Sequence, residues 1–398
     1  MKFAKADLLA LRQTRLMRSN GLFIISVTAI FFLGACRTTA KTATIPAVNH
    51  LRFVNQFVLP NALPFGGTVV GGLSGIDYDR RRDQYYLICD DPSAVSPARF
   101  YTMKIPLSAK GIDSVLVTGV TVILDPFGNP YPDIRKDRIH SADLEAMRYD
   151  PSRDELVRAS EGQRVINADT TQLQSPDIVI MDRNGHYKDS FFLPSNLRIR
   201  KEEKGPRHNS VLEGLAFDKT NSQLFVSVED ALYEDGPKAG LGDSTALIRI
   251  FRFDRNTKKQ SAAYAYKLDP VPYPATPPGA FKINGVSDIM SIGNNRLLVI
   301  ERAWSTGRIP SNIRVYLADL NEAQDISGIP SLLQTPPRKT VSKKLLLNME
   351  DLGFPVYNVE GVTFGPKLPN GHASLIFVVD DNFSKTEKNQ FLLFEVID

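Results

Sequence analysis

The chain has 398 residues, of which 42% are hydrophobic and 23% are charged. This length predicts one large domain or two to three ordinary ones, and the composition excludes a disordered or collagen-like chain. The formal net charge of +4 arises within residues 1–35, which hold five basic residues and one acidic residue. The remainder is neutral overall, so no basic excess is left to bind nucleic acid.

The first predicted element is a signal peptide. Basic residues precede an apolar run at residues 22–33, which is short for a membrane-spanning helix and matches the core of a signal peptide. The tetrapeptide that ends at Cys36 (LGAC) resembles a bacterial lipobox. The resemblance implies cleavage before Cys36, lipidation of its thiol and, because Arg37 follows, sorting to the outer membrane. An ordinary signal peptide with a chance cysteine is the alternative.

These features predict a signal peptide at residues 1–35, a lipidated tether at residues 36–50 and a single domain at residues 51–398. The protein would then sit in the bacterial cell envelope and touch the membrane only through its lipid. The second cysteine, Cys89, lies in an apolar run typical of a buried strand, where no basic neighbour would lower the pKa of its thiol. We therefore expect Cys89 to be structural.

A repeat of about 70 residues follows. Each copy opens with a short apolar and acidic motif and closes with one or two charged residues, most of them acidic. The motifs begin at Leu73, Leu144, Leu212, Ser287 and Val359. Apolar strands flank a polar turn in each copy, which predicts a β-hairpin. The first and last motif residues should lie opposite each other at the open end of the hairpin.

Two more strands are expected after each hairpin. The third strands are predicted at residues 100–105, 178–182, 247–253, 313–317 and 391–396, and the fourth at 117–124, 187–193, 262–268 and 343–348. The fifth copy lacks a fourth strand, and residues 51–59 form an unpaired strand at the other end of the domain. A ring closed by that N-terminal strand is an all-β propeller, with five blades or alternatively six. Residues 321–333 are the one short helix expected.

The hairpin motifs place carboxylates opposite one another. The predicted pairs are Glu145 with Glu161, Glu213 with Glu229, Asp288 with Glu301, and Glu360 with Asp380. Like charges directly opposite are destabilising, so cations from loops, a bound metal or raised pKa values must compensate. An oxygen-only ligand set suits Ca²⁺ or Mg²⁺. Alternatively, the acids accept backbone N–H bonds and brace the blades. Ser74 takes the glutamate position in the first copy.

Long loops before the hairpins supply candidate donors and cations, since binding residues usually lie on loops of a rigid scaffold. Arg207 and Lys282 are the candidates for stabilising phosphoryl charge. The other candidate substrate-binding residues are His140, His208, Asn209, Asn284, Arg302, Asn358 and Asn382.

At these motifs the chain is similar to the esterase-like phytase family, also called phytase-like domain proteins. The motifs are residues 71–79, 209–217, 284–288, 358–366 and 379–383, and the resemblance spans roughly residues 65–398. It implies a propeller-like domain in secreted or surface-anchored bacterial proteins. It also implies hydrolysis of phosphoesters or phosphodiesters that depends on Glu and Asp residues. Ser74 and Ala146 depart from the Glu-Gly motif.

We hypothesise that the protein hydrolyses a small anionic phosphate ester or diester. The cation would be held by Glu213, Glu229, Asp288, Glu301, Glu360 and Asp380. A water activated by the cation would attack, with Glu145 or Glu161 as the base. A calcium-dependent lactonase or carboxylesterase, which would not need Arg207, is one alternative. A surface binding module without turnover is the other.

Overall fold

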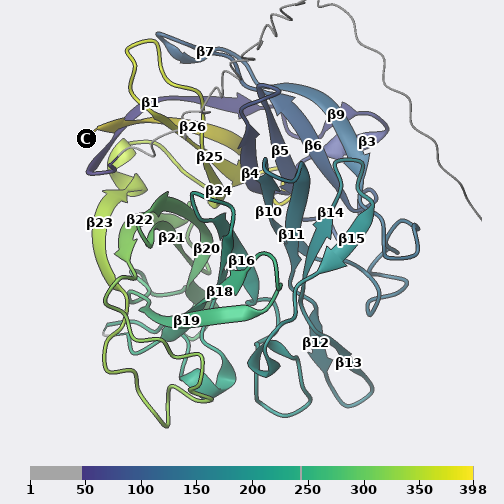
Figure 1. The fold of residues 1–398 in the computed structure, drawn as a ribbon, viewed down its shortest axis with the longest axis vertical. Helices are drawn as coiled ribbons and strands as arrows, with labels where there is room; N and C mark the ends of the chain where they lie inside the picture. The colour runs from purple at the N-terminus through teal and green to yellow at the C-terminus, as the bar shows by residue number, and fades with distance from the viewer. Residues whose placement is uncertain (1–46, 243, 398) are drawn as a thin grey trace, which may run out of the picture. The chain divides into compact units, whose positions relative to one another are not determined.

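The computed structural model describes residues 47–242 and 244–397, so the predicted signal peptide and the lipidation site Cys36 lie outside it. The described residues form five four-stranded antiparallel sheets, which are arranged around a common centre (Figure 1). Each sheet is one blade of a β-propeller. The predicted five-bladed all-β fold is therefore confirmed.

The strands of each blade are given from the centre outward. Blade 1 contains β4 (Leu73–Asp79), β5 (Gln84–Cys89), β6 (Arg99–Lys104) and β9 (Leu116–Val122), and blade 2 contains β10 (Leu144–Asp150), β11 (Glu155–Ser160), β14 (Asp177–Met181) and β15 (Tyr187–Ser190). Blade 3 contains β16 (Leu212–Phe217), β17 (Gln223–Val228), β18 (Leu247–Asp254) and β19 (Gln260–Lys267). Blade 4 contains β20 (Lys282–Gly293), β21 (Arg296–Ser305), β22 (Asn312–Asp319) and β23 (Ser342–Asn348), and blade 5 contains β24 (Asn358–Phe364), β25 (Ser374–Asp380), β26 (Asn389–Ile397) and β1 (His50–Leu59).

The ring is closed by the two ends of the domain. Strand β1 pairs antiparallel with β26, with Leu51 opposite Val396, as predicted. The innermost strands contact one another in the order β4, β10, β16, β20 and β24, and β24 returns to β4. Closure leaves each blade with neighbours on both sides, which protects the sheet edges near the centre.

The hydrophobic core lies between the blades. Buried side chains of blades 2, 3 and 4 form one cluster, and further clusters join blade 4 to blade 5, blade 5 to blade 1 and blade 1 to blade 2. This arrangement follows from the apolar runs of the inner strands, because sheets buried on both faces need continuous rather than alternating apolar sequence. A rigid interior of this kind fixes the positions of the residues at the centre of the ring.

Each innermost hairpin carries a β-bulge at the motif. The register shifts between Leu73 and Gly75 in blade 1, and at the equivalent place in every other blade. A bulge adds one unpaired residue to one strand and turns its side chain. The glycine after the bulge has a steric cause: a Cβ at Gly214 would lie 2.8 Å from the backbone nitrogen of Ile289 in the next blade.

The bulges correct the predicted pairs. Asp380 lies opposite Asn358 and not Glu360, and the N–H groups of Glu161 and Glu229 donate to the carbonyls of Asp143 and Val211, two positions before Glu145 and Glu213. In blade 4, Glu301 lies opposite Val286, and Asp288 lies opposite Ile300, so Asp288 and Glu301 do not face each other. The bulge residue of this blade is Ser287. A shift of one residue moves a side chain to the other face of the sheet. The prediction treated Asp288 as the motif acid of blade 4, but the bulge places Ser287 at that position.

The predicted helix at residues 321–333 is also wrong. This stretch forms turns, and the side chain of Asp325 accepts hydrogen bonds from the N–H groups of Ser327 (2.9 Å) and Ala263 (3.1 Å), which fix it to β19. Short 3₁₀ helices occur instead at Ser195–Leu197, Tyr233–Asp235 and Met349–Leu352. Two-stranded hairpins are added at β2 (Leu63–Phe65) and β3 (Thr68–Val70), β7 (Leu107–Ser108) and β8 (Gly111–Ile112), and β12 (Gln163–Ile166) and β13 (Thr171–Gln174). Across residues 47–242 and 244–397, no helix has the length and apolar character to cross a membrane.

Candidate metal and substrate site

Two sets of equivalent residues meet at one end of the central channel. The first set consists of the bulge residues of the innermost strands: Ser74, Glu145, Glu213, Ser287 and Glu360. The second set lies just after the second strand of each hairpin or, in blade 4 and blade 5, within it. In blade 1, Leu73 before the bulge pairs with Cys89, and Asp90 follows Cys89. The equivalent residues of the five blades are Asp90, Glu161, Glu229, Arg302 and Asp380. Blade 4 thus contributes a serine and an arginine where blades 2, 3 and 5 contribute two acids.

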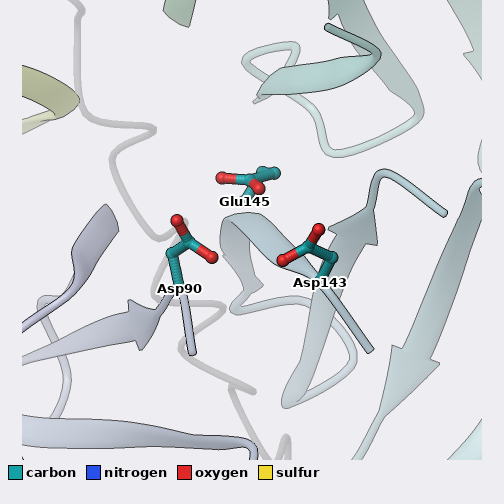
Figure 2. Close-up of side chains that lie close together, drawn as sticks. All are labelled: Asp90, Asp143 and Glu145. Carbon is teal, nitrogen blue, oxygen red and sulfur yellow. The ribbon is translucent and has the colours of Figure 1, made fainter. Parts of the chain in front are cut away.

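Five of these and neighbouring acids form what we term the acid cluster: Asp90, Asp143, Glu145, Glu161 and Glu213. Glu145, Glu161 and Glu213 each have a carboxylate oxygen that lies within 4.8 Å of the corresponding oxygens of the other two residues. The same holds for Asp90, Asp143 and Glu145, and Figure 2 shows these three carboxyl groups turned toward a common space. Glu145 belongs to both trios and therefore joins them.

The acid cluster is buried among like charges. Apart from the half-buried Asp90, its members are buried, and Glu161 is fully enclosed. Burial first and the negative charge of Glu229 second raise the pKa of Glu161 to about 8. Burial and neighbouring carboxylates also raise the pKa values of Glu145, Glu213 and Asp90 well above their usual range. The folded protein therefore retains protons here unless positive charge is supplied.

Several oxygens in and beside the acid cluster accept no hydrogen bond. Glu161 Oε1 accepts from the N–H of Val211 (2.6 Å), but its Oε2 is buried without a partner, as are Glu360 Oε2 and Asp380 Oδ2. Buried polar atoms without partners are uncommon and call for an explanation such as a bound ion. Carboxylate oxygens at this density fit Ca²⁺ or Mg²⁺, which take oxygen ligands. The residues present therefore suit a divalent cation.

Arg302 supplies positive charge beside the acid cluster. Its guanidinium forms ion pairs with Glu229 (2.7 Å) and Glu360 (3.0 Å) and donates to Asn358 Oδ1. Burial alone would lower the Arg302 pKa, but the carboxylates of Glu360 and Glu229 raise it, so the side chain stays charged. One guanidinium neutralises only part of the surrounding negative charge.

A cavity of about 300 Å³ opens above Arg302 and Glu229. We call it the mouth cavity, and its walls come from blades 3, 4 and 5 and adjoining loops. It is lined by Asn209, Glu229, Phe281, Ile283, Arg302, Trp304, Ile309, Pro310, Ser311, Tyr357, Asn358, Asn382 and Glu387. Of the predicted substrate-binding residues, it brings together Asn209, Arg302, Asn358 and Asn382.

Further along the same channel the buried acids have hydrogen-bond or ion-pair partners. We call Asp77, Arg148 and Asp288 the plug. Both oxygens of Asp288 accept from Arg148 Nη2 (2.8 and 2.6 Å), and Arg148 Nη1 donates to the carbonyl of Ile76 (2.9 Å). The carboxylate of Asp77 accepts from the N–H of Tyr149 (2.8 Å) and the hydroxyl of Thr363 (3.0 Å). Asp288, predicted as a metal ligand, thus lies in the plug and not in the acid cluster.

The structure separates other predicted residues from the cluster. Glu301 alternates with Arg302 along β21 and so faces the other side of the blade, where it accepts from Tyr266 (2.8 Å) and Asn284 (2.7 Å). This places both Glu301 and Asn284 away from the mouth cavity. Lys282 likewise alternates with Phe281 and Ile283, and it is these two residues that line the cavity.

Arg207 and the two histidines occupy the surrounding loops. Arg207 donates to the carbonyls of Ala231 and Gly236 (both 2.9 Å), so its guanidinium is engaged in holding the loop that follows β17. His140 is exposed and pairs with Asp137 (2.8 Å). His208 is exposed on the surface. Partial loss of water around its ring, followed by the positive charges of nearby arginines, lowers its pKa.

Sequence reasoning missed Asp90 and Asp143 as site residues. Asp90 closes the first repeat, and its place after Cys89 matches that of Glu161 after Ser160, so the repeat itself carried a signal. Asp143 precedes β10 and accepts from Gln163 (2.9 Å). Nothing in the repeat marks Asp143, because the equivalent residue of the other blades is not acidic.

The fold and the site together define a five-bladed propeller with a buried acid cluster at one end of its channel. Residues 68–383 match the model of the phytase-like family, described as esterase-like activity of phytase. Because the match covers more than half of the chain, the protein belongs to that family. No curated protein matches the chain.

The chain also matches solved structures at low identity. An α-L-arabinofuranosidase from Lactobacillus brevis is 10% identical, with a TM-score of 0.44 over 82% of this chain and 91% of its own. The Dos1 propeller is 7% identical, with a TM-score of 0.33 over 81% and 68%. A gluconolactonase from Xanthomonas campestris is 8% identical, with a TM-score of 0.32 over 88% and 99%. At this distance the likeness says nothing of activity.

Proposed function

We propose that the protein hydrolyses phosphate esters or diesters and that it depends on a divalent cation held by the acid cluster. The observation that carries the proposal is the set of buried carboxylates with unpartnered oxygens beside an open cavity that presents a guanidinium. Membership of a family described by an esterase-like activity supports a hydrolase.

The acid cluster would hold the cation through Glu145, Glu161 and Glu213, with room for a second through Asp90, Asp143 and the shared Glu145. When bound, such a cation polarises a phosphoryl oxygen and makes water a better nucleophile at neutral pH. Glu229, Glu360 and Asp380 would then orient Arg302 and the rim of the site. From the same geometry we propose Ca²⁺ first and Mg²⁺ second, because Ca²⁺ tolerates more ligands and less regular geometry.

Electrostatics make a cation a condition for binding an anion. Carboxylates outnumber Arg302 around the mouth cavity, so a phosphate would be repelled from the uncompensated site. The chain's own residues would act as follows. Arg302 would bind a phosphoryl oxygen, Asn358 and Asn382 would orient the ester, and Glu161 or Glu145 would accept the proton of the attacking water. Arg302 takes the role that the sequence had suggested for Arg207 and Lys282.

A carboxyl ester or lactone is the second candidate substrate. It is favoured by one observation: Arg302 is already engaged by Glu229 and Glu360, which a neutral substrate would leave undisturbed. We also propose, from the sequence alone, that lipidation of Cys36 anchors the protein in the bacterial cell envelope, with sorting to the outer membrane.

The test is hydrolysis by the soluble protein that begins at Arg37. A chromogenic phosphodiester, a phosphomonoester and a carboxyl ester are each supplied with calcium and with a chelator. Calcium-dependent turnover of a phosphoester is the expected result. Turnover of the carboxyl ester alone would replace the proposal with the lactonase or carboxylesterase. No turnover of any substrate would favour a binding module.

A further inference from the structure

The residues that line the mouth cavity fall into two chemically different groups, which we call its polar wall and its apolar wall. Glu229, Arg302 and Asn358 form a polar wall next to the acid cluster. Phe281, Trp304 and Ile309 belong to the other wall, and Trp304 is the one tryptophan of the chain. A site for a highly charged ligand alone would have no use for the second wall.

The apolar wall is exposed and ordered by ring contacts. Phe281 and Ile309 are 56% and 63% exposed, and the rings of Phe281 and Trp304 lie 5.9 Å apart with an interplanar angle of 40°. Exposed large apolar side chains that gather in a concave site are a mark of ligand binding. Aromatic faces favour a flat apolar group, because stacking adds to the burial of its surface.

The spacing of the two walls is set by one strand. Arg302 and Trp304 lie two positions apart on β21, so their side chains share a face and their Cα atoms are separated by about 7 Å. Both line the cavity. A ligand that places an anionic group at Arg302 can therefore reach the indole ring with its next portion.

The charges of the cavity argue against a polyphosphate. Among the lining residues that the structure describes, Arg302 is the one basic side chain, and two glutamates, Glu229 and Glu387, share the cavity with it. In an inositol hexakisphosphate every ring carbon carries a phosphate, so some phosphates would have to lie against Trp304 and Phe281 or beside these glutamates. A charged group pressed against apolar surface loses hydration without gaining a partner.

We infer that the mouth cavity binds a phosphate mono- or diester whose alcohol portion carries a flat apolar ring, and that it discriminates against fully phosphorylated cyclitols. The identity of the anionic group rests on the proposed function. The apolar half rests on Phe281, Trp304 and Ile309.

The lone tryptophan gives a direct binding assay. In calcium buffer, the fluorescence of Trp304 is titrated with phenylphosphonate, methylphosphonate and inositol hexakisphosphate, none of which requires turnover. We expect phenylphosphonate to bind at least tenfold more tightly than methylphosphonate and more tightly than the hexakisphosphate. Phe281→Ala should remove about tenfold of the preference, the size expected for one aromatic contact.

The matched control is Phe127→Ala, which removes an 88% exposed phenylalanine that does not line the cavity and should leave all three affinities unchanged. Equal binding of the two phosphonates, no binding of phenylphosphonate, or tightest binding of the hexakisphosphate would overturn the inference. Failure of the proposed function gives a different result. If the protein prefers phenylphosphonate but hydrolyses no ester, the inference on the cavity stands and the proposed hydrolase activity is rejected. Hydrolysis without ring preference does the reverse.

Discussion

The acid cluster and the plug lie in the same channel but treat charge in opposite ways. In the plug, Asp288 meets Arg148 through both of its oxygens, and Asp77 is bonded from two neighbouring blades. In the acid cluster, carboxylates face carboxylates, and Glu161 keeps an unpartnered oxygen. The contrast teaches that burial of charge alone does not mark a functional site. A missing counter-charge is the more informative sign.

The largest expected effect is on the plug. Asp288→Asn removes one partner of a buried ion pair and takes from Arg148 the carboxylate that it contacts directly, so the free energy of unfolding should fall by about 3–5 kcal/mol. Urea unfolding followed by circular dichroism measures this. A double variant, Arg148→Met with Asp288→Leu, removes both members of the ion pair and should recover part of the loss. Recovery should be incomplete because the buried Asp77 loses the nearby charge of Arg148. Unchanged unfolding of Asp288→Asn would contradict the structural role of the plug.

The same kind of substitution in the acid cluster should affect activity instead. Glu213→Gln keeps the shape of the side chain but removes a charge from a like-charged group, so activity should fall by about 100-fold or more, equivalent to roughly 2.7 kcal/mol. Without calcium, its stability should equal or exceed that of the wild type. The control is Glu322→Gln, which changes a 79% exposed side chain. A folded and fully active Glu213→Gln variant would exclude Glu213 from the mechanism.

The pH dependence of stability sharpens the comparison further. Burial and Glu229 raise the pKa of Glu161 from 4.5 to about 8, so between these values the native state binds more protons than the unfolded state. Stability without a cation should therefore fall as pH rises from about 5 to about 8. The melting temperature in chelator should drop by on the order of a few degrees.

Calcium should flatten or reverse this slope, because the cation competes with protons for the same oxygens. Glu161→Gln should also flatten it in chelator. If the melting temperature in chelator rises over this range, the acid cluster does not hold the protons that its burial implies.

The smallest expected effect is on KM, and it distinguishes Arg302 from Arg207. Arg302→Lys should raise KM by about tenfold, because a point charge replaces the guanidinium between Glu229, Glu360 and the substrate. Arg207→Lys should change KM less than twofold and lower the free energy of unfolding by about 1 kcal/mol, through lost hydrogen bonds to the loop that follows β17. Steady-state kinetics and urea unfolding on both variants measure this. The opposite ranking in KM would restore Arg207 to the site.

The repeat was enough to predict the blades and their closure, because apolar runs separated by turns leave few alternatives. Glu145, Glu161 and Glu213 were also found, since each repeats the same motif. The fourth blade was misread: Asp288 matched the motif by residue type, while the bulge placed Ser287 at that position. Bulges depend on contacts with the neighbouring strand, so the periodicity of the sequence alone does not reveal where they occur. The hydrogen bonds of Arg207 could not be predicted from the sequence either, because their acceptors are carbonyls of the loop that follows β17.

The pairing of β1 with β26 has a consequence for how the protein reaches its native state. Arg52 binds Glu395 across 343 positions of the sequence, so the fifth blade is complete only after nearly the whole domain has emerged from the ribosome. Contacts of such long sequence separation form slowly, and until they do the outer edge of β26 stays unpaired and open to other chains. Folding of this protein therefore has its most aggregation-prone moment just before the last blade receives its fourth strand.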